Sequence, residues 1–96
     1  MSEEIKSISK IIRPILKKYN VKKAGIFGSY SRGSQNKKSD VDILVEIGEE
    51  ADLLDLIRLK MTLEKNLKKS VDLVEYDLIR EELREKILDE EVSVII

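Results

Sequence analysis

A chain of 96 residues is long enough for one domain and too short for a second hydrophobic core, so we treat residues 1–96 as a single domain. Hydrophobic residues make up 42% of the chain and aromatic residues only 4%, which predicts a folded protein whose core is built from Ile, Leu and Val. The net charge of -1 provides no general attraction for a polyanion, so nucleic acid is an unlikely direct ligand.

The chain contains neither cysteine nor histidine. Disulfides, thiolate metal sites, imidazole bases and Ser-His-Asp triads are therefore excluded, and carboxylate, hydroxyl, lysine and tyrosine chemistry remains. The N-terminus does not resemble a signal peptide, and no apolar run approaches the ~20 residues of a membrane span, so we expect a cytoplasmic protein without membrane contact. A charged fraction of 39% is also typical of thermophile proteins rich in ion pairs.

The first part of the chain predicts a helix followed by a strand. From Glu3 to Tyr19, apolar residues recur every three or four positions, which is the period of one buried helical face. Pro14 lies inside this stretch and predicts a kink or a division into two short helices. The apolar run Val21 to Phe27 predicts a buried strand that ends in a tight turn at Gly28.

A polar loop and a second strand follow. Residues 28–39 contain two glycines and predict a loop, with one helical turn from Ser29 to Arg32. The run Val41 to Ile47 predicts a strand in which Asp42 and Leu44 lie on one face and the neighbouring β-branched residues on the other.

The remaining sequence predicts a helix, a strand, a helix and a short edge strand. The first helix spans Ala51 to Leu67 and the strand spans Val71 to Tyr76. A second amphipathic run extends from Leu78 to Glu90 behind Asp77 as a candidate N-cap, and Val92 to Ile96 predicts the edge strand. The order of elements predicts an α/β (α+β) fold with a small mixed sheet flanked by helices.

The predicted topology brings three acidic residues to one edge of the sheet. The helix over residues 51–67 is long enough for a right-handed crossover, which makes the strands before and after it parallel. Asp40 and Asp42 begin one of these strands and Asp72 begins the other, so all three carboxylates emerge at the same edge. An antiparallel first strand would bring Gly28 and Ser29 to that edge as well.

Clustered carboxylates repel one another and require a cation. Ligands that are all oxygen favour Mg²⁺, or alternatively Mn²⁺, with substrate phosphates completing the coordination. Gly28 allows a phosphate to approach the backbone, Ser29 adds a hydroxyl group, and Arg32 can supply a fixed positive charge. Taken singly, these features also fit ordinary turn residues, and Lys37 and Lys38 also fit a solvated loop. Their combined spacing favours a site.

At these positions the sequence resembles the DNA polymerase beta type nucleotidyltransferase superfamily, and within it the minimal nucleotidyltransferases. The matching segments are Phe27 to Gly33, Ser39 to Val45 and Val71 to Val74. The resemblance implies the polymerase beta type nucleotidyltransferase fold. It also implies that Asp40 and Asp42 bind metal ions, that Asp72 is the third catalytic carboxylate, and that Gly28 and Ser29 hold the triphosphate of a nucleotide.

Small members of this group are typically antitoxins encoded beside an all-helical HEPN-type ribonuclease toxin, and some transfer AMP from ATP to a tyrosine of that toxin. The resemblance therefore implies a hetero-complex with such a toxin, because 96 residues leave no room for a domain that would grip the acceptor. Two alternatives remain open. The protein could bind its partner by contact alone, with an inherited but idle site, or it could modify a small molecule.

Overall fold

The structure is a computed structural model that describes residues 2–36 and 38–96, so Lys37 lies outside the described residues. The elements in chain order are α1 (Glu3–Lys18), β1 (Lys23–Phe27), α2 (Ser29–Arg32), β2 (Val41–Glu46), α3 (Leu53–Leu67), β3 (Val71–Glu75), the 3₁₀ turn η1 (Tyr76–Leu78), α4 (Glu81–Glu90) and β4 (Val92–Val94). Within the described ranges, no helix is both long and apolar enough to cross a membrane.

The four strands form one mixed sheet in the order β3-β2-β1-β4. β2 and β3 are parallel, with α3 as the crossover between them, whereas β1 is antiparallel to both β2 and β4. The predicted mixed sheet and the parallel pair are therefore confirmed, and the antiparallel first strand brings Gly28 to the edge where the aspartates lie. β4 pairs with β1 at the edge, as expected for a short C-terminal strand.

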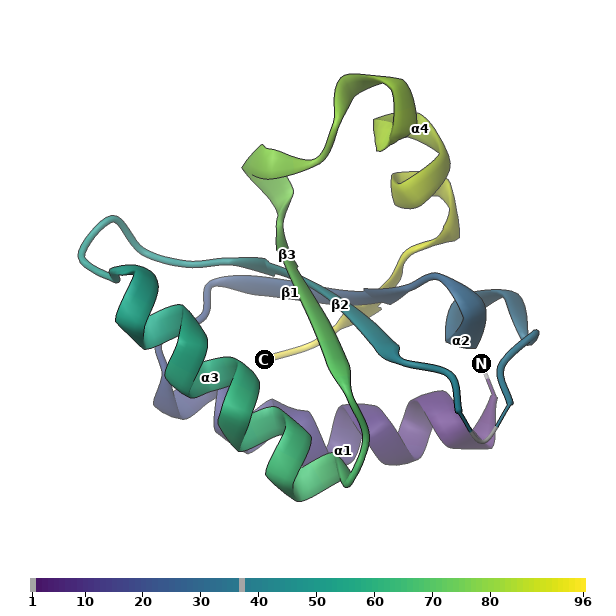
Figure 1. The fold of residues 1–96 in the computed structure, drawn as a ribbon, viewed down its shortest axis with the longest axis horizontal. Coiled ribbons are helices and arrows are strands. Elements are labelled where there is room, and N and C mark those ends of the chain that lie inside the picture. The colour runs from purple at the N-terminus through teal and green to yellow at the C-terminus, as the bar shows by residue number, and fades with distance from the viewer. Residues whose placement is uncertain (1, 37) are drawn as a thin grey trace.

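The sheet has two unequal faces. α1 and α3 lie side by side beneath it, whereas η1 and α4 rise above the opposite face (Figure 1). The main core fills the space between the sheet and the two long helices, and includes Ile12, Leu16, Ile26, Ile43 and Leu63. A smaller cluster on the opposite face contains Phe27, Leu44, Tyr76 and Ile79. The upper face is therefore only partly covered by protein.

α1 is one uninterrupted helix, so the division predicted at Pro14 is wrong. The Ser2 side chain caps its start by accepting a hydrogen bond from the Ile5 amide at 3.1 Å. Ile12 and Leu16 lie on either side of Pro14 and are both fully buried, whereas Pro14 itself is exposed. Packing of the buried face thus offsets the backbone hydrogen bond that proline removes.

The last helix begins later than the sequence pattern predicts. α4 starts at Glu81, its N-cap is Arg80, and Asp77 lies in η1 instead of capping a helix. Tyr76 and Ile79 are both buried in the smaller cluster, and Ile79 has extended backbone angles. Burying these two side chains requires a turn and an extended residue where the periodicity alone predicts continuous helix.

Candidate functional site

Asp42 and Asp72 occupy paired positions on the neighbouring parallel strands β2 and β3. Residues paired in this way point to the same face of a sheet. Because Asp42 alternates with the core residues Val41 and Ile43, both aspartates lie on the upper face, away from α1 and α3. Asp40 directly precedes β2. The convergence of three carboxylates predicted from the sequence is therefore present in the structure.

The three aspartates interact electrostatically. The pKa of Asp42 is raised from its ordinary value of 3.8 to about 6, chiefly by burial and then by the nearby charges of Asp72 and Asp40. The Arg32 guanidinium opposes this rise. Asp42 is half-buried, whereas Asp40 and Asp72 are exposed. Burial and the neighbouring carboxylates therefore disfavour the ionised form of Asp42, and a bound cation would offset this effect.

Gly28 lies against Asp42. β1 pairs antiparallel with β2 so that Phe27 is opposite Asp42, and Gly28 follows at the end of the strand. Gly28 has φ 75° and ψ -146°, a conformation essentially reserved for glycine. A Cβ atom on Gly28 would lie 2.9 Å from the Asp42 Cγ atom and would also collide with Oδ2. Only glycine allows the turn to come this close to the carboxylate.

The predicted helical turn after Gly28 is present as α2. The Arg32 amide donates to the Gly28 carbonyl at 3.1 Å, and the Ser31 hydroxyl donates to the same carbonyl at 3.0 Å. Gly33 ends the turn in the left-handed conformation. Ser29 is half-buried directly beside Gly28, at the sheet edge where the aspartates converge. This geometry places the residues of the predicted phosphate cradle together, and phosphate binding by them remains a prediction.

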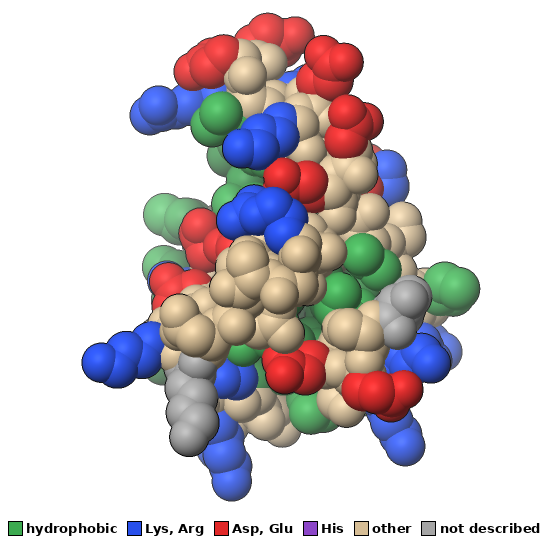
Figure 2. Space-filling view, turned by 90° about the vertical axis from the view of Figure 1, so that its right-hand side faces the viewer, with side chains coloured by type: hydrophobic (Ala, Val, Ile, Leu, Met, Phe, Trp, Pro, Cys, Tyr) green, Lys and Arg blue, Asp and Glu red, His purple; other side chains and the backbone are tan. Residues whose placement is uncertain are grey.

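Arg32 contacts an element that the sequence pattern did not connect to the site. Its Nη1 atom lies 3.0 Å from the Glu90 Oε2 atom on α4, and the two form an ion pair across 58 positions of the chain. Figure 2 views the side of the molecule on which α2 lies, and several acidic side chains are gathered at its α4 end. No local sequence signal identifies Glu90, because its role depends on α4 folding back over the sheet.

The donor set fits a hard divalent cation, because the three side chains at the site offer only carboxylate oxygens. Within residues 2–36 and 38–96, no group of three or more acidic side chains is arranged to hold a metal ion as it stands. Asp40 and Asp72 are exposed, so their side chains have room to rotate toward Asp42. The donor chemistry therefore fits a divalent cation, coordination would require side-chain adjustment, and metal binding by these residues remains a prediction.

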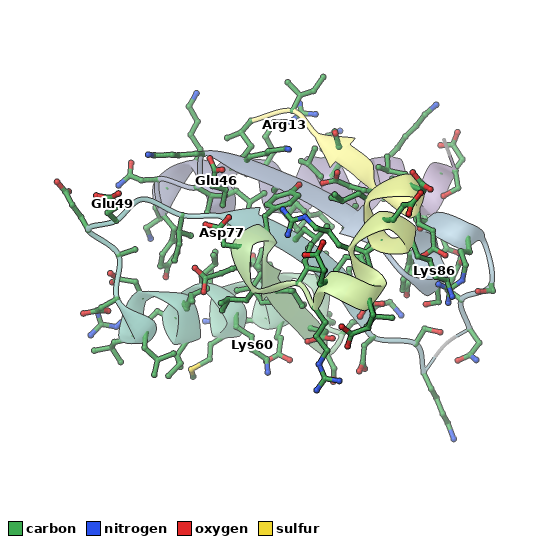
Figure 3. All side chains as sticks on the ribbon, turned by 90° about the horizontal axis from the view of Figure 1, so that it is seen from above. Arg13, Glu46, Glu49, Lys60, Asp77 and Lys86 are labelled. Carbon is green, nitrogen blue, oxygen red and sulfur yellow. The ribbon has the colours of Figure 1, made fainter. Side chains whose placement is uncertain are left out.

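A second polar cluster occupies the same face farther from α2. The Tyr76 hydroxyl donates a hydrogen bond to the Glu91 carboxylate, which lies over Gly25, and the Lys23 Nζ atom is 4.5 Å from the centre of the Tyr76 ring. Burial, and then the bond to Glu91, raise the pKa of Tyr76, so the phenol stays protonated. The charge of Glu46, which is labelled in Figure 3, acts in the same direction. This cluster anchors the start of β4 to the sheet.

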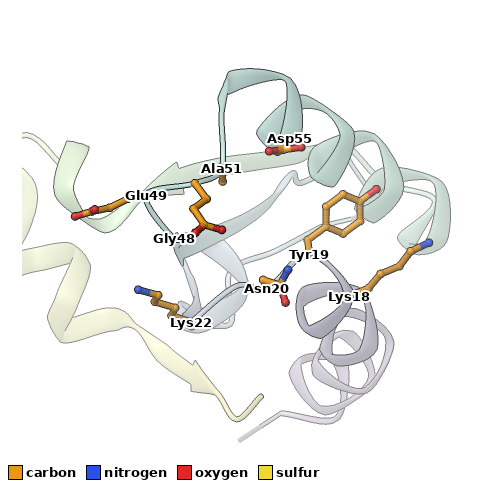
Figure 4. A pocket seen from close by; sticks show the side chains of 9 residues that line it. Lys18, Tyr19, Asn20, Lys22, Gly48, Glu49, Ala51 and Asp55 are labelled. Atoms are coloured by element: carbon orange, nitrogen blue, oxygen red, sulfur yellow. The ribbon is translucent and has the colours of Figure 1, made fainter.

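A cavity of about 680 Å³ lies at the opposite end of the sheet from α2 (Figure 4). It is lined by residues at and after the end of α1 and by residues before and at the start of α3, and these include Tyr19, Lys22, Gly48 and Asp55. None of the predicted site residues contributes to it. The cavity is therefore separate from the acidic site.

Comparisons with known proteins agree with this geometry. The profile of the family "Polymerase beta, Nucleotidyltransferase" matches residues 10–96. A candidate protein adenylyltransferase of Methanocaldococcus jannaschii is 52% identical over 91 residues, which cover 95% of this chain and 98% of the relative. The protein adenylyltransferase MntA of Thermococcus cleftensis is 40% identical over 93 residues, which cover 96% of this chain and 94% of the relative.

Two solved structures have closely similar folds. A candidate minimal nucleotidyltransferase superimposes with a TM-score of 0.81 and 32% identity, and the match covers 94% of this chain and 92% of the other. A toxin-antitoxin crystal structure with AMP-PNP superimposes with a TM-score of 0.79 and 26% identity, and the match covers 91% of this chain and 72% of the other. The paired aspartates, the adjacent glycine turn and these similarities lead to one conclusion: this chain is a nucleotidyltransferase of the polymerase beta family.

Proposed function

We propose that the protein transfers AMP from ATP to a hydroxyl group of a partner protein, and that this partner is an HEPN-type ribonuclease toxin which the modification neutralises. The observation that carries the proposal is the pairing of Asp42 with Asp72 beside Gly28, on the open face of the sheet. Two relatives support it through their names as protein adenylyltransferases, one of them as a candidate. A structural relative supports ATP as the nucleotide, because its crystal structure contains AMP-PNP. The same structure is a toxin-antitoxin complex, which supports a toxin as the partner.

Asp40, Asp42 and Asp72 would hold Mg²⁺ or Mn²⁺ in the working enzyme. A bound ion would supply positive charge to the phosphates and to the acceptor oxygen. The raised pKa of Asp42 fits this role, because a cation would offset the burial and repulsion that now disfavour its ionised form.

The chain's own residues would position the reactants. Gly28 and Ser29 would hold the triphosphate against the start of α2, where the glycine leaves room for a phosphate to approach. Asp72 is exposed on the same face, so it can orient the acceptor hydroxyl and take its proton. The acceptor oxygen would form a bond to the α-phosphorus as the bond to the β-phosphate bridging oxygen breaks, and pyrophosphate would leave.

The test is to incubate the protein with α-labelled ATP, Mg²⁺ and the product of the neighbouring gene. We expect label on that partner, an added AMP mass in its spectrum and loss of its ribonuclease activity. The Asp42→Asn variant is the matched control and should transfer no measurable label. A stable complex without added mass would replace the proposal by neutralisation through contact, and label on a small molecule alone would reassign the acceptor.

A further inference from the structure

We propose that the protein self-associates through the outer face of α3, as a two-fold dimer in which the two copies of α3 run antiparallel. α3 carries two apolar faces. One, which includes Leu59 and Leu63, is buried against the sheet. The other, which we call the outer stripe, is exposed and consists of Leu53, Leu54, Ile57 and Met61, with exposed fractions of 72%, 51%, 46% and 63%.

The outer stripe has the spacing of a helix-packing surface. Leu53, Ile57 and Met61 follow one another at intervals of four residues and form one ridge along the helix, with Leu54 beside it. Contiguous exposed apolar side chains of this kind typically mark a protein contact. In a two-fold arrangement centred on Ile57, each Leu53 contacts Met61 of the second copy. The outer stripes of the two copies therefore bury each other.

The distribution of charge along α3 favours a second copy of this chain as the partner. It also favours an antiparallel orientation of the two α3 helices. Residues 49–55 carry four acidic side chains and no basic one, whereas residues 58–69 carry five basic side chains and one acidic one. In Figure 3 the acidic side chain of Glu49 lies at the end of the molecule where α3 begins, and the basic side chain of Lys60 lies partway along the helix.

The remaining acidic residue of the basic segment is already engaged, because the Glu64 carboxylate accepts a hydrogen bond from the Val71 amide at 3.0 Å. The helix dipole explains acids near the start of a helix and bases near its end, but Arg58 and Lys60 lie mid-helix. Antiparallel pairing places the acidic segment of each copy over the basic segment of the other.

The proposed contact leaves the nucleotidyltransferase site open. α3 lies beneath the sheet, whereas Asp42 and Asp72 lie on its upper face (Figure 1). A dimer through the outer stripe therefore presents two acidic sites that face away from the contact. The α3 contact would form whichever acceptor those sites modify.

The first test uses analytical ultracentrifugation of the full chain over a concentration series. We expect a monomer-dimer equilibrium, and Leu53→Lys should raise the dimer dissociation constant at least about tenfold, because it places a positive charge in an apolar contact and against the basic segment of the other copy. The matched control is Leu78→Lys, since Leu78 is 71% exposed, lies in η1 and should leave the equilibrium unchanged. A chain that stays monomeric, or a dimer that only the control variant weakens, would overturn the proposal.

The second test uses the absence of cysteine from the native chain. Ile57→Cys places one thiol near the two-fold axis and should form a disulfide-linked dimer under mild oxidation, whereas Leu78→Cys should not. Efficient cross-linking of both variants, or of neither, would contradict the two-fold contact.

A third test distinguishes a second copy from the helical partner. If the chain alone is monomeric and Leu53→Lys instead abolishes binding to the neighbouring gene's product, the outer stripe belongs to that partner and the dimer is rejected. AMP transfer by dimer-deficient Leu53→Lys should remain measurable, so failure of the dimer is distinguishable from failure of the enzymatic proposal.

Discussion

The Arg32 guanidinium lies 3.0 Å from the Glu90 carboxylate, which ties the turn after Gly28 to the last helix. The same guanidinium opposes the rise in the pKa of Asp42, so it also acts on the acidic site. A triphosphate held by Arg32 would have to compete with Glu90 for this side chain. If Arg32 binds the nucleotide, the ion pair would place Glu90 of α4 in competition with it.

Replacing Glu90 by glutamine should therefore strengthen nucleotide binding. Exposed ion pairs contribute up to about 1 kcal/mol, so we expect the ATP dissociation constant to fall by about two- to fivefold in calorimetric titration. Asp89→Asn removes the same charge from the neighbouring residue and should change the affinity less. Weaker ATP binding by Glu90→Gln would indicate instead that the ion pair positions Arg32 for the phosphates.

Asp42→Asn should reduce nucleotide transfer by at least about 10²-fold while the fold is retained, because loss of a charged group at the reacting centre usually costs several kcal/mol in the transition state. Circular dichroism checks the fold, and single-turnover transfer of labelled AMP checks the activity. Transfer at the wild-type rate would remove Asp42 from the catalytic residues.

The same substitution should stabilise the metal-free protein in a pH-dependent way. The folded-state pKa of Asp42, about 6, lies above its ordinary value of 3.8, so the ionised carboxylate disfavours folding. This penalty is absent below pH 3.8, grows as the pH rises toward 6, and is complete above 6. Partial exposure of the side chain limits the effect.

We therefore expect Asp42→Asn to melt a few degrees above the wild type at pH 7 in EDTA, with the difference disappearing below pH 4. Glu50→Gln removes one negative charge at the opposite end of β2 and should show a smaller difference. A melting difference that is equal at pH 4 and pH 7 would contradict the electrostatic interpretation of this site.

Gly28→Ala should weaken ATP binding and also destabilise the protein, because the new Cβ atom collides with Asp42 and the backbone has φ 75°. Gly33→Ala is the comparison variant, since Gly33 has φ 73° and ψ 18°, the left-handed conformation that other residues can adopt, and nothing lies within 4 Å of the added atom. We expect about 1 kcal/mol of destabilisation for the control and more for Gly28→Ala, measured by urea unfolding. Equal costs would contradict both the collision with Asp42 and the backbone strain at Gly28.

Local sequence patterns were sufficient to predict most elements of this fold. Apolar residues recur at every second position in a half-buried strand and about every 3.6 positions in an amphipathic helix, and both patterns can be read from neighbouring residues. The strand Val41 to Glu46 and the helix Leu53 to Leu67 are therefore close to their predicted bounds. The length of the crossover helix also determines that Asp42 and Asp72 enter parallel strands, and parallel strands place their starts at one edge.

The C-terminal part depended on contacts that no local pattern encodes. Helix propensity favours a helix from Leu78, but burial of Tyr76 and Ile79 against Phe27 and Leu44 requires an extended segment, so α4 begins at Glu81. Likewise, Pro14 predicts a kink or a division into two helices, but packing on both sides of Pro14 keeps α1 one continuous helix.

The sequence by itself determined which chemical groups the site contains, because residue type and strand order suffice to gather three carboxylates and a glycine turn at one edge. Only the tertiary structure decided the pKa of Asp42 and the ion-pair partner of Arg32. Burial and the charges of Asp72 and Asp40 raise the pKa of Asp42, and Glu90 reaches Arg32 from 58 residues away. Burial, charge and ion pairing depend on distances between segments remote in the chain, and those distances exist only after the chain has folded.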